Sequence, residues 1–102
     1  MNIFDIYLGK IILLIKRLNK EGSLELPESL NGINVDIPPS NFDCDISTNV
    51  AMVLSKTNKK SPTDIAKTLV NLIKTEDEEI EMITVAKPGF INIKFKAIYW
   101  NN

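Results

Sequence analysis

Apolar side chains recur every three or four residues over the first part of the chain, which is the repeat of one face of an α-helix. They are Ile3, Phe4, Tyr7, Leu8, Ile11, Leu14, Ile15 and Leu18. Gly22 follows as a natural stop, so the pattern predicts a helix over residues 2–20. Ile6 and Leu13 fall on a second flank of this helix. That flank is either additional core or a surface that docks against a partner domain.

The segment after this helix is rich in turn-forming residues. It contains Pro27, Gly32, Pro38 and Pro39. One extended stretch, Ile33 to Ile37, is a candidate first strand. Whether a further strand forms near Leu24 to Leu26 stays open at this level.

Two more helices are predicted in the middle of the chain. Asp45 or Ser47 can cap the first of them. Its apolar face consists of Ile46, Val50, Ala51, Val53 and Leu54. Ser61 can cap the second, where Pro62 suits the first helical position and Asp64 suits the first turn. Its apolar face consists of Ile65, Ala66, Leu69, Val70, Leu72 and Ile73.

The period changes to two near the C-terminal end. Ile83 and Val85 alternate with Met82 and Thr84, residues 86–89 form a turn, and alternation resumes at Ile91, Ile93 and Phe95. This pattern is typical of a β-hairpin. The order of elements predicts one α+β domain over residues 1–102, with a small antiparallel sheet packed on one face by about three helices.

Charge is balanced in total but not along the chain. The 102 residues carry a net charge of -1, so bulk electrostatics does not draw the molecule to a polyanion. Residues 46–75 nevertheless hold five lysines and one acid, and the stretch from residue 82 onward holds lysines and no acid. Any nucleic-acid contact must therefore be local.

The composition excludes much familiar chemistry. There is no histidine, so no imidazole base and no Cys/His zinc site can form. The one cysteine, Cys44, lies between two aspartates, whose charges raise a thiol pKa. The acidic run 76–81 resembles a solvated segment more than a metal site. The longest apolar run, residues 11–15, is too short to span a bilayer. We expect no catalytic residue, no metal, no membrane contact and a cytoplasmic location.

One face of the last strand carries residues that suit RNA. If Ile91, Ile93 and Phe95 point inward, then Phe90, Asn92, Lys94 and Lys96 point to the opposite side. An aromatic ring can stack on an unpaired base, an amide can read a base edge, and lysines can meet phosphates. The alternative is that this row is merely the solvated face of an amphipathic strand.

Three segments resemble the N-terminal accessory domain of bacterial-type arginyl-tRNA synthetases. They are Asp43-Cys44-Asp45-Ile46-Ser47-Thr48-Asn49-Val50-Ala51-Met52, the Ser-Pro-x-x-Ile-Ala of residues 61–66, and Val85-Ala86-Lys87-Pro88-Gly89-Phe90-Ile91-Asn92-Ile93. Their order and spacing agree with the family along the whole chain. Cys44 and Lys87 depart from the pattern, because glycine is usual at both positions.

The resemblance implies a domain that contacts the D-loop and outer corner of arginine tRNA. Phe90 and Asn92 match the positions that meet an unpaired D-loop base, and Lys87, Lys94 and Lys96 would neutralise nearby phosphates. The parent enzyme would use ATP in a catalytic domain that this sequence does not contain, with an anticodon-binding domain beyond it. We therefore expect no cofactor and no aminoacylation by this chain alone. The alternative function is a structural module that docks on the catalytic domain in cis through the first helix.

Overall fold

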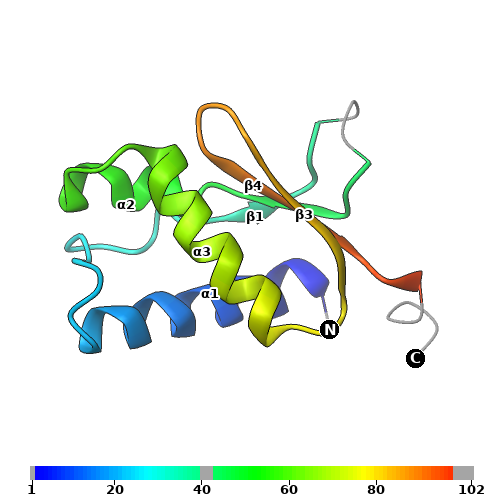
Figure 1. The fold of residues 1–102 in the computed structure, drawn as a ribbon, viewed down its shortest axis with the longest axis horizontal. Coiled ribbons are helices and arrows are strands. Elements are labelled where there is room, and N and C mark those ends of the chain that lie inside the picture. The colour runs from blue at the N-terminus through cyan, green and yellow to red at the C-terminus, as the bar shows by residue number, and fades with distance from the viewer. Residues whose placement is uncertain (1, 40–42, 98–102) are drawn as a thin grey trace.

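The structure is a computed structural model that describes residues 2–39 and 43–97. Three helices and four strands lie in these residues (Figure 1). In chain order they are α1 (Ile3–Lys20), β1 (Val35–Asp36), β2 (Ile46–Thr48), α2 (Val50–Asn58), α3 (Pro62–Glu76), β3 (Ile80–Ala86) and β4 (Phe90–Phe95). The α+β class predicted from the sequence is confirmed.

Local capping sets the ends of two helices. At α1, the side chain of Asn2 accepts a hydrogen bond from the backbone N–H of Phe4. At α3, the Oγ of Ser61 accepts from the N–H of Asp64 at 3.1 Å, and Pro62 occupies the first turn. Each bond satisfies a backbone donor that has no partner within its helix. The predicted start of α3 is therefore confirmed, as is the extent of α1.

The predicted cap and start of α2 were wrong. Residues 46–48 form strand β2, and the helix begins at Val50, after Asn49. The side chain of Asn49 makes no cap hydrogen bond. It accepts instead from the N–H of Asn34 at 2.8 Å and donates to the carbonyl of Gly32 at 2.9 Å. Asn49 thus ties the loop before β1 to the start of α2.

The strand candidates in the first half were only partly right. β1 is limited to Val35–Asp36, shorter than the expected Ile33–Ile37. No strand forms at residues 24–26, and Leu24 instead lies buried in the core. The fourth strand is β2, whose three residues are too few to show a period of two.

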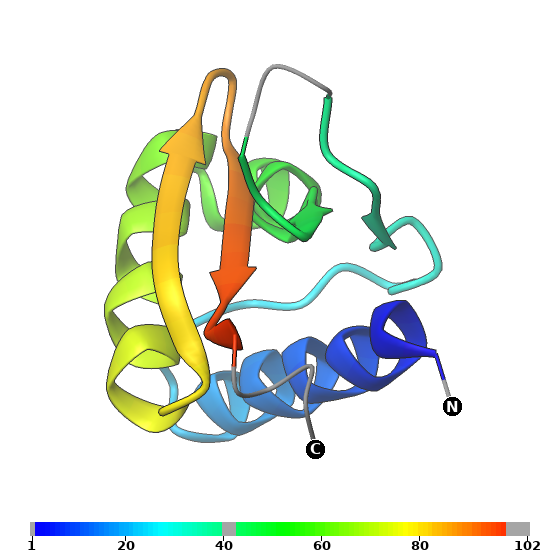
Figure 2. The same cartoon turned by 90° about the vertical axis from the view of Figure 1, so that its right-hand side faces the viewer.

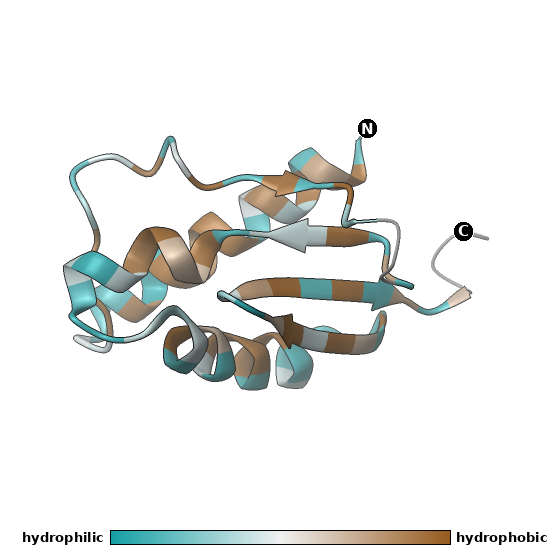
Figure 3. Cartoon of the chain, turned by 90° about the horizontal axis from the view of Figure 1, so that it is seen from above, coloured by the Kyte–Doolittle hydropathy of each residue, from teal (hydrophilic) through white to brown (hydrophobic). Residues whose placement is uncertain are grey.

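The four strands form one antiparallel sheet in the order β1-β2-β4-β3. α2 and α3 lie behind the β3–β4 hairpin in Figure 2, and α1 runs below it. Figure 3 shows apolar and polar residues alternating along the two long strands. The buried core joins α1, α2, α3 and the inward rows of the sheet. Among the described helices, none is long and apolar enough to cross a membrane.

Candidate nucleic-acid interface

The β3–β4 hairpin has one face toward the helices and one face that no described helix covers (Figure 2). Ile91 and Ile93 are fully buried on the helix side, and Phe95 on the same row contacts the ring of Tyr7 with centroids 5.3 Å apart. By the strand period, Phe90, Asn92 and Lys94 stand on the other side. We call this other side the helix-free face.

The turn of the hairpin packs on the start of α3. A Cβ atom added at Gly89 would lie 2.5 Å from the Cβ of Pro62, which no side chain could occupy without a backbone shift. The turn also contains the cis peptide bond between Lys87 and Pro88. Two of the segments that carry the family resemblance therefore touch each other. This contact fixes the position at which Phe90 enters the sheet.

Phe90 is exposed as expected, with 38% of its surface accessible. Its register partner on β3 is Ala86. Directly opposed residues of an antiparallel pair share a face, and a methyl group shields little of a neighbouring ring. The ring of Phe90 is therefore available for stacking on the helix-free face.

By the strand period Asn92 is on the expected side of the strand, but it is buried, so the alternative of a merely solvated face does not hold at this residue. Its exposed fraction is 1%, and neither Nδ2 nor Oδ1 has a hydrogen-bond partner among the described residues. Asn92 lies on an inner strand, between Ser47 of β2 and Thr84 of β3. The strand period indicates which side a residue faces but does not indicate what closes over it.

Lys94 is engaged within the domain. Its Nζ lies 2.8 Å from Oδ2 of Asp43 and 3.5 Å from Oε2 of Glu81. The hydrogen bond to Asp43 raises the pKa of Lys94 above its ordinary value, and the charges of Asp43 and Glu81 raise it further. Lys94 is thus a firmly charged ammonium group whose charge is offset by two carboxylates. An RNA phosphate would have to compete with them.

The other two lysines lie outside the strand. Lys87 is in the hairpin turn and Lys96 follows the end of β4, and both side chains are exposed. The backbone N–H of Lys96 donates to the carbonyl of Glu79 at 2.8 Å. Neither lysine has an ion pair among the described residues. Their charges are free to meet an anion near either end of β4.

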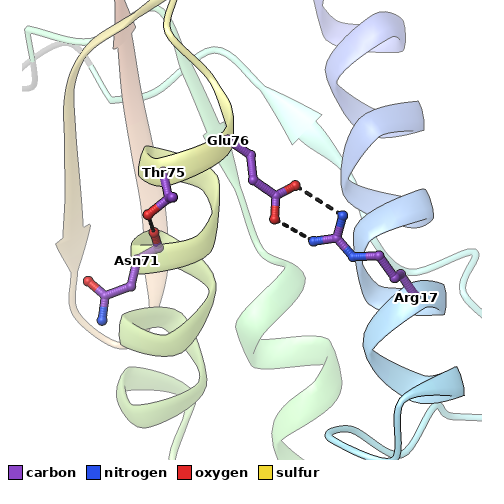
Figure 4. A network of polar contacts seen from close by, with 4 residues as sticks. All are labelled: Arg17, Asn71, Thr75 and Glu76. Atoms are coloured by element: carbon purple, nitrogen blue, oxygen red, sulfur yellow. Dashed lines mark hydrogen bonds and ion pairs between the residues drawn. The ribbon is translucent and has the colours of Figure 1, made fainter.

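The acidic run 76–81 has a structural use that the sequence did not suggest. The guanidinium group of Arg17 in α1 forms a bidentate ion pair with the carboxylate of Glu76 in α3 (Figure 4). The hydroxyl of Tyr7 donates to Oδ2 of Asp77 at 2.8 Å. These bonds join α1 to the end of α3, and the first of them lowers the pKa of Glu76. The described residues contain no group of three or more His, Cys, Asp or Glu side chains suited to a metal ion.

The thiol of Cys44 has a raised pKa, in the direction expected from its two aspartate neighbours. Its thiol pKa is raised, first by partial burial and then by the charges of Asp43 and Asp45. A thiolate is the reactive form of cysteine, so a raised pKa disfavours a nucleophilic role.

A groove lies between α1 and the segment that leads from α3 into β3. Its volume is about 650 Å³, and Leu13 and Leu14 line it together with Arg17, Glu78 and Glu79. Leu13 is 71% exposed, whereas Ile6 is partly buried. Of the two residues predicted on the second flank of the helix, only Leu13 is presented fully to solvent.

The comparisons with known proteins point to the same family that the three motif segments resemble. The family model described as "Arginyl tRNA synthetase N terminal domain" matches residues 10–95. This match covers most of the chain. The fold and the matched family therefore define the class of the protein as an accessory domain of an aminoacyl-tRNA synthetase. The chain belongs to the arginyl-tRNA synthetase N-terminal domain family.

Relatives in several bacteria carry the name arginine–tRNA ligase. The Pelagibacter ubique (strain HTCC1062) protein is 82% identical over 102 residues, which is 100% of this chain and 18% of that protein. The Brucella ovis (strain ATCC 25840 / 63/290 / NCTC 10512) protein is 41% identical over 103 residues, covering 98% of this chain and 17% of the relative. The chain therefore spans less than a fifth of the length of these relatives.

Proposed function

We propose that this domain binds arginine tRNA by its D-loop and outer corner, through the helix-free face of β3 and β4. The observation that carries the proposal is the side-chain amide of Asn92, whose two polar atoms are buried without partners beside the exposed ring of Phe90. An unpaired loop nucleotide supplies both a ring to stack and an edge with donors and acceptors.

The state of Asn92 has an energetic consequence. A buried polar group without a hydrogen-bond partner costs about 1–3 kcal/mol. Because nearly all buried polar groups in folded proteins are paired, an unpaired amide at a surface sheet is a group that a ligand can satisfy. Asn92 is 1% exposed, so binding includes a local opening of the side chains that close over it.

The charges around the site suit a weak and salt-sensitive contact. Lys87 and Lys96 are exposed near the two ends of β4 and would meet phosphates directly. Lys94 would contribute only after exchanging Asp43 and Glu81 for a phosphate. Two or three lysine contacts give modest affinity, so the rest of a longer enzyme would supply most of the binding.

By its relatives, the chain would be part of an arginine–tRNA ligase that works in the cytoplasm. Activation of arginine with ATP and transfer to tRNA would occur in a domain outside these residues. The chain itself would supply no catalytic group, hold no metal and use no cofactor. Pure chain that catalysed arginine-dependent pyrophosphate exchange would contradict this division of labour.

The test is the affinity of the chain for an arginine tRNA transcript at low salt, measured by fluorescence anisotropy. Stacking of one base on an aromatic side chain is worth about 1–3 kcal/mol, so Phe90→Ala should weaken binding by roughly fivefold to a hundredfold. Leu13→Ala, an exposed apolar truncation on α1, is the matched control and should bind with the affinity of the unsubstituted chain. Equal affinities for all three proteins would overturn the proposal.

A second candidate function is docking on the catalytic part of the same enzyme through α1. Leu13 favours it, because a leucine that is 71% exposed at the rim of a groove is the kind of group that a partner covers. Alanine at Ile6 and Leu13 would then abolish association with the catalytic part and leave RNA binding unchanged. If the double variant lost RNA binding instead, the docking role would be excluded.

A further inference from the structure

We infer that Thr84 and Met82 of β3 complete a slot for one unpaired nucleobase. Thr84 gives a hydrogen bond to the edge of the base, and Met82 covers the face of the base that Phe90 leaves open. The inference rests on the RNA-binding role proposed above and adds two residues from the neighbouring strand to it.

The register of the hairpin places these residues together. Ala86 is opposite Phe90, Thr84 is opposite Asn92, and Met82 is opposite Lys94. Directly opposed residues share a face with Cβ atoms roughly 5 Å apart, and successive pairs on that face are about 7 Å apart along the strands. The ring of Phe90 and the thioether of Met82 therefore stand on either side of a polar floor made by Thr84 and Asn92.

An irregularity in β3 lies directly before this arrangement. The register shifts between Ile80, opposite Phe95, and Met82, opposite Lys94, which leaves Glu81 as the extra residue of a bulge. In a regular strand Ile80 and Ile83 would face opposite sides, yet both pack against the core. The bulge lets both face inward, while Met82, the neighbour of Ile83 in the regular part of the strand, faces the helix-free side by ordinary alternation. Bulges often re-aim a side chain next to a functional site.

Exposure separates the walls of the slot from the core. Met82 is 40% exposed and Phe90 is 38% exposed, and both are among the large hydrophobic side chains that the described residues leave in solvent. A thioether is polarizable and adapts its shape to a ring, and an aromatic ring stacks on any base. Two such groups on one face, with a polar pair between them, fit the two faces of a base.

The side chains of Thr84 and Asn92 form a polar floor of the slot. The hydroxyl of Thr84 makes no hydrogen bond within the described part of the chain, and the amide of Asn92 makes none either. Thr84 is exposed whereas Asn92 is closed, so a base that enters from the β3 side meets Thr84 first. A hydroxyl can donate or accept, so Thr84 holds many bases, while the fixed donor and acceptor of Asn92 discriminate among them.

The experiment measures the affinity of the whole chain for an arginine tRNA transcript at low salt. Loss of one neutral hydrogen bond in Thr84→Val should weaken binding roughly threefold to tenfold. Loss of one apolar contact in Met82→Ala should weaken it roughly twofold to fivefold. Thr57→Val on α2 and Leu13→Ala on α1 are the matched controls and should bind like the parent. Melting curves confirm that each variant is folded.

The outcomes separate the slot from the proposed function. If Phe90→Ala weakens binding but Thr84→Val and Met82→Ala do not, the slot is wrong and RNA binding by this face stands. If Phe90→Ala is also without effect, RNA binding by this face is wrong. In the Thr84→Val, Phe90→Ala double variant, the losses should combine to less than their sum, because both residues contact the same base. Full additivity would place Thr84 outside the slot.

Discussion

The ammonium group of Lys94 and the carboxylate of Asp43 lie 2.8 Å apart, although 51 positions separate the two residues in the sequence. The pair joins β4 to the segment before β2. It places an acid where an RNA phosphate would otherwise approach Lys94.

Asp43→Asn should therefore strengthen binding to arginine tRNA at low salt. Exposed ion pairs are weak because solvent screens them, so the gain should be small, roughly twofold to fivefold. The pKa of Lys94 is raised, so this lysine stays charged at neutral pH and the gain should be independent of pH there. Asp36→Asn is the control, because it removes an exposed acid of β1 without releasing a lysine. Equal gains in both variants would indicate net charge alone.

Asn92→Leu should stabilise the free chain while it abolishes RNA binding. Replacement of the unpartnered amide by an apolar group of similar branching removes a desolvation cost of about 1–3 kcal/mol, which corresponds to a rise in Tm of several degrees in a domain of this size. The same substitution at Asn58, whose side chain makes three hydrogen bonds, should destabilise. Thermal melts and tRNA titrations measure both effects. A lower Tm for Asn92→Leu would mean that the amide is satisfied in solution.

Lys87 and Lys96 should govern the salt dependence of binding. For single-stranded RNA the slope of log affinity against log salt is about -0.7 for each phosphate contact. The double variant Lys87→Ala, Lys96→Ala should therefore reduce the magnitude of the slope by about 1.4. Lys67→Ala, an exposed lysine on α3, should leave it unchanged. A slope that is the same in all proteins would remove these two lysines from the interface.

The Arg17–Glu76 pair should make stability depend on pH in the acid range. The hydrogen bond from Arg17 lowers the pKa of Glu76 below its ordinary value of 4.5. A lowered carboxylate pKa contributes stability above the unfolded value and loses it as pH falls through the folded value. Glu76→Gln should thus be less stable than the parent at neutral pH, and the difference should vanish well below pH 4.5. Glu78→Gln, an acid without an ion pair in the described structure, should show no such convergence.

The sequence was informative wherever a regular repeat ran over several residues. The helical spacing of α1, the Ser61–Pro62 start of α3 and the alternation from Ile83 to Phe95 all predicted elements that the structure contains. The sequence did not predict β2, because three residues are too few to show a period of two and because Ile46 also fitted the apolar face of the following helix. Local pattern could not decide between the two.

The sequence predicted which side of β4 the candidate residues face, but not how buried they are or which side chains they contact. Alternation placed Phe90 and Asn92 on the same face, yet the burial of Asn92 and the pairing of Lys94 depend on segments far away in the sequence. Asp43 is one such partner. Alternation with Ile83 already placed Met82 on the side away from the core, but its place on the same face as Phe90 and Asn92 depends on how β3 pairs with β4. The bulge at Glu81 matters for Ile80, which a simple count from Ile83 would place on the outer side although it packs against the core.

The most direct test of the central claim is an NMR titration of the isotope-labelled chain with an arginine tRNA transcript at low salt. The side-chain NH₂ signals of Asn92 and the backbone amides of Phe90 and Thr84 should shift, and added salt should reverse the shifts. Signals from α1 around Leu13 should stay in place. Unchanged signals on the β3–β4 face at saturating RNA, or shifts confined to α1, would contradict RNA binding by the helix-free face.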